Sequence, residues 1–186
     1  MRLLCSIAGA ALLAVSALAQ GTVNFANLGA NLDAPFYLSY PTPLSTANGP
    51  WWAMLYAGAG DVPEELLSSA IVSGSPAEVG SPFPGYVLGG TRTIAGIPAG
   101  SPATLQVRVW RSDLGATWEE ALTTSSPYIG RSIPITVDLG GGSVATPNML
   151  NLVSFQIVPE PSVIALGALG IVSIFLCRRR KAQALR

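Results

Sequence analysis

The central part of this 186-residue chain is predicted to form a single antiparallel β-sandwich, jelly-roll or immunoglobulin-like, with one or two short helices. Apolar and polar residues alternate with a period of two in several short segments, as they do in half-buried strands. Turn-forming runs such as Asn48-Gly49-Pro50 and Gly140-Gly141-Gly142 separate those segments. No internal repeat of fixed period appears, so a solenoid or a propeller is disfavoured.

The first 19 residues have the three features of a secretory signal peptide. Arg2 precedes an uncharged apolar run, and that run ends in the small-x-small sequence Ala17-Leu18-Ala19. We therefore expect cleavage after Ala19, which makes Gln20 the new N-terminus. An uncleaved anchor helix is the alternative interpretation.

Residues 20–157 are expected to form the folded ectodomain, which is long enough to be stabilised by its core alone. The alternation is clearest over 102–111, where Leu105, Val107 and Val109 share one predicted face. Trp110 falls on the opposite face with the polar residues.

A second segment, 151–158, repeats the alternation with Val153, Phe155 and Ile157 on one face. The further predicted elements are strands over 21–28, 34–40, 51–58, 85–91 and 131–139, and short helices over 63–70 and 116–124.

The C-terminal segment, 158–186, has three parts in a set order. In Val158-Pro159-Glu160-Pro161, the two prolines lack amide donors and restrict the residues before them, so Glu160 is expected to be extended and exposed. Residues 162–177 carry no charge, and as a helix they would span about 24 Å, slightly less than a hydrocarbon core of ~30 Å. The basic tail, 178–186, begins with the cations Arg178, Arg179, Arg180 and Lys181, which the positive-inside rule keeps in the cytoplasm as a stop-transfer block.

This order of motif, apolar helix and basic block resembles the PEP-CTERM sorting signal of Gram-negative bacteria. The resemblance implies that an exosortase, a membrane-embedded cysteine protease or transpeptidase, recognises Pro159, Glu160 and Pro161. It further implies transient anchoring in the inner membrane, followed by delivery to the cell surface or extracellular matrix in an exopolysaccharide or biofilm setting. A rigid spacer in front of a permanent single-pass anchor is the alternative.

The middle of the chain resembles a group of short secreted proteins that carry the same sorting signal. The matching residues are the Gly-Thr-Val-Asn-Phe start at 21–25, Leu-Tyr-Ala-Gly at 55–58 and Gln-Val-Arg-Val-Trp at 106–110. This resemblance implies a shared fold and no particular activity.

Charge and composition exclude several classes of function. Between residues 21 and 158 there are four arginines, no lysine and nine acidic residues, a net charge of about −5, which disfavours a nucleic-acid partner. The two cysteines, Cys5 and Cys177, lie in the terminal apolar segments, so the ectodomain has neither a disulfide nor a thiol nucleophile. The chain has no histidine, which removes Ser-His-Asp catalysis and the usual zinc sites, and we expect no metal and no cofactor.

A pair of carboxylates, as used in glycoside hydrolysis, is the catalytic chemistry that remains. The candidates are Asp113, Glu119 and Glu120, although the two glutamates also fit the solvated face of a short helix. Trp110 is the candidate for stacking on a sugar ring, with packing in the core as the alternative.

We therefore expect an exported, non-enzymatic protein with a structural or adhesive role in an exopolysaccharide layer. A carbohydrate-binding module is the alternative, and a carboxylate-based glycosidase is a third hypothesis.

Overall fold

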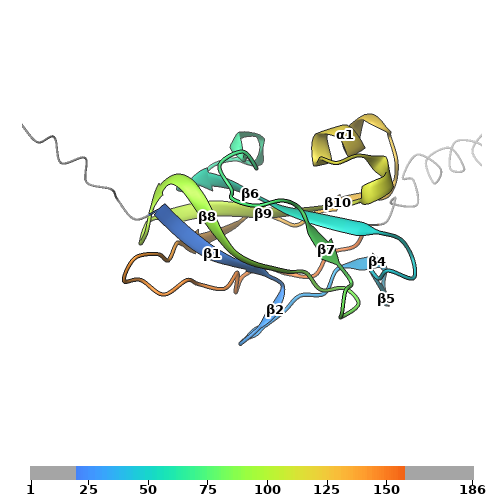
Figure 1. Cartoon of the computed structure of the whole chain (residues 1–186), viewed down its shortest axis with the longest axis horizontal. Coiled ribbons are helices and arrows are strands. Elements are labelled where there is room, and N and C mark those ends of the chain that lie inside the picture. The colour runs from blue at the N-terminus through green and yellow to red at the C-terminus, as the bar shows by residue number, and fades with distance from the viewer. Residues whose placement is uncertain (1–19, 158–186) are drawn as a thin grey trace, which may run out of the picture.

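The computed structural model describes residues 20–157, which form a mainly β domain with antiparallel sheets (Figure 1). The predicted mainly β, antiparallel character is confirmed. The strands are β1 (Gln20–Ala26), β2 (Leu28–Gly29), β3 (Leu32–Asp33), β4 (Tyr37–Ser39), β5 (Thr42–Pro43), β6 (Trp51–Ala59), β7 (Ala77–Val79), β8 (Leu88–Pro98), β9 (Pro102–Arg111), β10 (Ile129–Arg131) and β11 (Ile135–Asp138). The helical elements are the 3-10 turns η1 (Glu64–Leu66) and η2 (Ser112–Leu114) and the helix α1 (Trp118–Thr123).

The largest sheet has the strand order β10–β9–β6–β7, and β11 shares the edge of β9 with β10. Its centre is the β6–β9 pair, which runs without a register shift from Trp51 opposite Arg111 to Ala59 opposite Ala103. The strand predicted over 102–111 coincides with β9, and the one predicted over 51–58 is β6 extended by a residue.

One face of this sheet, here called the inner face, is aliphatic. Leu105, Val107 and Val109 lie beside Ala53 and Leu55, and all five side chains are at most 1% exposed. They belong to one hydrophobic core with residues of β1 and β8. Full burial of a leucine or valine side chain is worth about 1.5–3 kcal/mol, so this face provides much of the stability.

The opposite, outer face of the sheet is also covered. A Cβ added to Gly58 of β6 would lie 2.5 Å from Val62 and 3.1 Å from Leu67, so the η1 segment lies against the sheet there. The helix α1 covers the face farther along, with Trp118 and Ala121 buried (Figure 1). The Thr117 hydroxyl caps the first turn of α1 by accepting a hydrogen bond from the Glu120 amide. The helix lies within the range predicted for it, 116–124.

The second sheet consists of β1 and β8, paired antiparallel with a register shift at each end of β1. The chain near Gly140 extends it, because Thr22 and Gly140 exchange two backbone hydrogen bonds of 2.8 Å. A Cβ on Gly140 would lie 2.3 Å from the Ala145 carbonyl oxygen, so only glycine fits this close approach.

The helix predicted over 63–70 is wrong beyond its first turn, since only η1 forms there. Leu67 already has an extended backbone, and Ser68 exchanges two hydrogen bonds with Ala57 on the open edge of β6. Pairing with a strand edge satisfies these amides and carbonyls, so no further helical turn is needed.

The strand predicted over 151–158 is also wrong within the described residues. Leu152 is 4% exposed and Val153 is 50% exposed, the reverse of the expected alternation, whereas Phe155 and Ile157 pack inward as expected. After a turn from Met149 to Leu152, the sheet contact of this segment is an isolated bridge between Gln156 and Tyr37.

The other predicted strands change length. The segment 131–139 divides into β10 and β11 at Pro134, which has no amide to donate, and the Ser132 hydroxyl accepts from the amide of Val107 in the gap. Residues 34–40 keep a strand over β4, 21–28 becomes β1, and the strand predicted over 85–91 is replaced by the longer β8.

The predicted signal peptide (1–19), the predicted sorting motif (158–161), the predicted membrane helix (162–177) and the basic tail (178–186) lie outside the described residues. Within 20–157, no helix has the length and apolar character needed to cross a membrane.

Candidate functional site

Trp110, the residue predicted to stack on sugars, lies on the outer face of β9 and is 1% exposed. Its indole N–H donates to the Gly115 carbonyl over 3.0 Å. A ring in this position presents no face to a ligand, so the expectation of sugar stacking by Trp110 is wrong. Trp110 lies on the other face of β9 from Leu105, as the alternation predicted, and the helix α1 covers that face and buries the ring.

Trp110 is the middle of a row of three indoles on the outer face. Trp52 of β6 meets it edge-on at a centroid distance of 6.3 Å, and Trp118 of α1 meets it edge-on at 6.5 Å. Edge-to-face pairs are worth about 0.5–1.5 kcal/mol beyond their area. The row therefore attaches α1 to the sheet.

Beside this row, Arg108 and Tyr56 form a second link between the sheet and α1. The Arg108 guanidinium lies 3.9 Å from the centroid of the Tyr56 ring, and its Nε donates to Gln106. The Tyr56 hydroxyl donates to Glu119 Oε1 over 2.7 Å. Two effects raise the pKa of Tyr56 to about 12, burial of the phenol being the larger and its hydrogen bond to the Glu119 carboxylate the smaller. The phenol is therefore a hydrogen-bond donor at neutral pH.

A cavity of about 110 Å³ lies between the sheet and the start of α1, bounded by Trp110, Trp118, Tyr56 and Glu119 with neighbouring residues. The indole and phenol walls are almost fully buried, and Glu119 is exposed at its margin. The space is small beside a typical ligand pocket of about 300–1,000 Å³.

The three candidate carboxylates each have a separate local partner. Asp113 accepts from Arg111 over 2.6 Å, and this hydrogen bond holds the pKa of Asp113 below its usual range. Glu119 accepts from Tyr56, and Glu120 Oε2 accepts from the Ala116 amide over 2.6 Å at the start of α1. Asp113 is therefore part of a surface ion pair, Glu119 links α1 to the sheet, and Glu120 caps the start of α1.

A group of tyrosines near β4 was not singled out by the sequence. Tyr40 is 69% exposed and meets Tyr37 edge-on at 5.3 Å. Tyr86 donates to Asp33 over 2.6 Å, and that hydrogen bond raises the pKa of Tyr86 to about 12, with a small contribution from Tyr37. Tyrosine content alone did not reveal the group, because Tyr86 is distant in the sequence from Tyr37 and Tyr40.

The C-terminal end of the described chain is fastened beside this group. Ile157 is fully buried, and its amide donates to the Tyr37 carbonyl over 2.8 Å. A Cβ on Gly130 would lie 2.8 Å from Ile157, so β10 leaves room for this side chain. Phe155 packs against Phe36 with their centroids 4.5 Å apart.

The predicted processing residues Ala17, Ala19, Pro159, Glu160 and Pro161 and the basic block Arg178 to Lys181 lie outside the described residues. Gln20, the expected N-terminus, is the first residue of β1 and is exposed. Among residues 20–157, no group of three or more acidic, cysteine or histidine residues is arranged to hold a metal ion. Comparison with family models, curated proteins and solved structures finds no match to this chain.

Proposed function

We propose that this protein is exported, recognised by an exosortase through a PEP-CTERM sorting signal and delivered to the cell surface or extracellular matrix of a Gram-negative bacterium. The observation that carries the proposal is the order of three features at the chain end. Pro159, Glu160 and Pro161 precede the uncharged run 162–177, and that run precedes the basic block Arg178 to Lys181. A motif of this order supplies an extended recognition segment, a membrane anchor and a stop-transfer charge.

The described domain supports this proposal at both of its ends. Gln20, the residue that would follow the signal cleavage, is an exposed residue of β1. Ile157 is fastened to Tyr37, and only Val158 separates it from Pro159. The sorting motif would therefore emerge directly from the folded surface, at a set place beside β4.

The architecture we propose is a two-layer β-sandwich, in which β1 and β8 cover the inner face of the β6–β9 sheet. It is supported by the shared hydrophobic core of the two sheets and by their antiparallel pairing. A closed, well-packed domain of this kind suits a structural or adhesive part of an exopolysaccharide layer. We propose no catalytic role, because Asp113, Glu119 and Glu120 each have a local structural partner.

Intact-mass analysis of the protein from separated cell fractions tests the sorting proposal. We expect a surface or extracellular form that starts at Gln20 and ends near Pro159 to Pro161. A form with the complete C-terminus, found only in the inner membrane, would show that 162–177 is a permanent anchor instead.

A matched pair of variants sharpens this test. Glu160→Ala is expected to leave the full-length chain in the inner membrane, because the recognition segment loses its only charge. Glu65→Ala removes an exposed carboxylate of the domain and should be processed like the parent. If the two variants were processed equally, the exosortase would not be recognising Glu160.

Carbohydrate binding is a second candidate function, and the exposed ring of Tyr40 favours it. Tyr37 lies against that ring, and the Gln156 amide oxygen accepts from the Tyr40 backbone, so a polar group adjoins the aromatic surface. Sugars bind to such surfaces by ring stacking combined with hydrogen bonds.

Binding of the intact mature protein to isolated exopolysaccharide, measured at high salt, tests this candidate. Tyr40→Ala should abolish binding, whereas Phe83→Ala, at another half-exposed aromatic residue, should not. If the parent protein does not bind, the candidate is wrong.

A further inference from the structure

Gln20 occupies a position where its side chain can react with its own backbone. It is exposed and begins β1, and under the proposed export it becomes the N-terminal residue. The inference below rests on that proposed function, specifically on cleavage after Ala19. An exposed glutamine side chain can change rotamer freely, so its carboxamide can reach the α-nitrogen.

The start of β1 is held firmly in place. A Cβ on Gly21 would lie 2.3 Å from Leu139, and a Cβ on Gly141 would lie 2.6 Å from the Gln20 carbonyl oxygen. Close packing at these two glycines fixes the Gln20 backbone against its neighbours. The register also shifts here, so that Gln20 lies opposite Pro98, which has no amide to donate.

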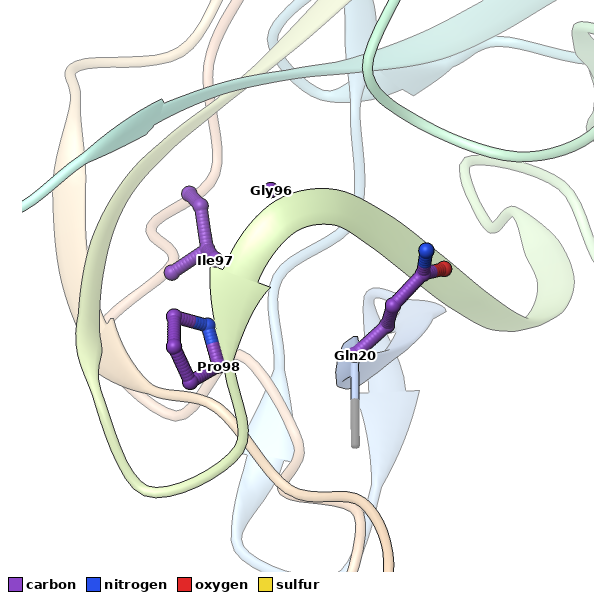
Figure 2. Close-up of a pocket in the computed structure, with 4 residues that line it drawn as sticks. All are labelled: Gln20, Gly96, Ile97 and Pro98. Atoms are coloured by element: carbon purple, nitrogen blue, oxygen red, sulfur yellow. The ribbon is translucent and has the colours of Figure 1, made fainter. Parts of the chain in front are cut away.

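A cavity of about 200 Å³ adjoins Gln20, and its other lining residues are Gly96, Ile97 and Pro98 of β8. Figure 2 shows these lining residues, with Gln20 at the start of β1 and with Gly96, Ile97 and Pro98 along the neighbouring β8. The cavity is therefore bordered by two apolar side chains beside the expected N-terminus.

A free α-amino group has a pKa of about 7.7–8.0, so a substantial fraction is neutral and nucleophilic near neutral pH. Its nitrogen can attack Cδ of the same residue and form a five-membered lactam. A bond forms between the α-nitrogen and Cδ, the bond from Cδ to Nε2 breaks, and Nε2 leaves as ammonia with a proton from the amine. Nothing is oxidised or reduced, and no co-reactant is consumed.

We propose that Gln20 is a modification site, at which the mature N-terminus cyclises to pyroglutamate and the lactam ring packs against Ile97 and Pro98. Cyclisation removes the ammonium charge at the start of β1. The α-nitrogen keeps one hydrogen, as an internal backbone amide does, so the start of β1 loses no donor.

The experiment uses the full chain, produced in its own cells, with the mature protein isolated rapidly from the cell surface. Intact-mass and N-terminal peptide analysis should show a chain that starts at residue 20 and is lighter by one ammonia molecule. A chain that starts at residue 20 with its complete mass would overturn the cyclisation and leave the export proposal standing. A chain that starts elsewhere would overturn the cleavage site and the cyclisation together.

The position of the ring is tested with pyroglutamyl aminopeptidase on the same mature protein. We expect the folded protein to resist the enzyme and the urea-unfolded protein to lose its first residue. Rapid removal from the folded protein would show that the ring lies outside the cavity. Gln20→Ala is the control, since it should start at residue 20 with no loss of ammonia, and a loss that develops only during storage would contradict cyclisation in the cell.

Discussion

The two faces of the β6–β9 sheet are both buried, and they are buried by different physical means. The inner face presents Leu55, Leu105 and Val107 to a hydrophobic core that also contains residues of β1 and β8, and burial of aliphatic surface stabilises it. The outer face presents Tyr56, Arg108 and other polar or aromatic residues, whose donors and acceptors need partners. Glu119 of α1 and the carbonyl groups of Ser132 and Gly60 supply such partners.

The difference shows how a strand with alternating apolar and polar residues can be buried on both faces rather than exposed on its polar face. In β9 the polar residues Thr104 and Gln106 are at most 2% exposed, nearly as buried as Leu105 between them. Gln106 donates to the Ser132 carbonyl and accepts from Arg108, and Thr104 donates to the Gly60 carbonyl. Satisfied hydrogen bonds make the burial of these groups tolerable.

The largest expected effects come from truncation on each face. Trp110→Ala on the outer face and Leu105→Ala on the inner face should lower the free energy of unfolding by about 3–5 and 2–5 kcal/mol, because each leaves a cavity. Urea unfolding measures both, with the half-exposed Val153→Ala expected within about 0.5 kcal/mol of the parent. If Trp110→Ala were nearly neutral, the outer face would not be a structural layer.

An intermediate effect is expected from Gln106→Met, which keeps the volume and removes the hydrogen bonds. The Ser132 carbonyl and the Arg108 Nε lose their partner, at a cost of about 1–3 kcal/mol. Chemical denaturation of the variant measures this cost, with Val107→Ile on the inner face as a control for packing. A Met variant as stable as the parent would mean that the outer face is held by packing alone.

A pH dependence should follow from the raised pKa of Tyr56, about 12 compared with an ordinary value of 10.0. Below pH 10 the phenol is protonated in both states and its contribution to stability is fully present. Between pH 10 and about 12 the unfolded chain releases this proton first, so the free energy of unfolding falls. Thermal unfolding from pH 9 to 12 measures the decline, which Tyr56→Phe should make shallower, and Tyr86 contributes in the same direction.

Tyr56→Phe should also cost about 0.5–1.5 kcal/mol near neutral pH, since one hydrogen bond to Glu119 is lost. An unchanged slope above pH 10 would show that Tyr56 does not titrate with folding.

The smallest effect is expected at the Arg111–Asp113 pair beyond the sheet edge. Asp113 is more than half exposed, and surface ion pairs contribute about 0–1 kcal/mol. Asp113→Asn should therefore change stability slightly, with the difference disappearing at high salt. A loss comparable to that of Trp110→Ala would instead make η2 part of the structural outer layer.

Several elements could be read from the chain because local physics decides them. β9 and β6 follow from alternating or continuous apolar runs bounded by turn residues, and α1 follows from Thr117 and the glutamates after it. The helix predicted over 63–70 and the strand predicted over 151–158 differ from the structure, since Ala57 and Tyr37, which lie in other segments, determine their backbone pairing.

By itself, the sequence determined the mainly antiparallel β class, the two strands at the centre of the main sheet and the presence of a short helix within 116–124, because these depend on the side-chain pattern within one segment. Only the tertiary structure decided that both sheet faces are covered, that Trp110 is buried, and that Tyr37, Tyr40 and Tyr86 gather near the end of the domain. Burial and proximity are set by which distant segments pack together, and the pattern within a single strand carries no information about what will cover it.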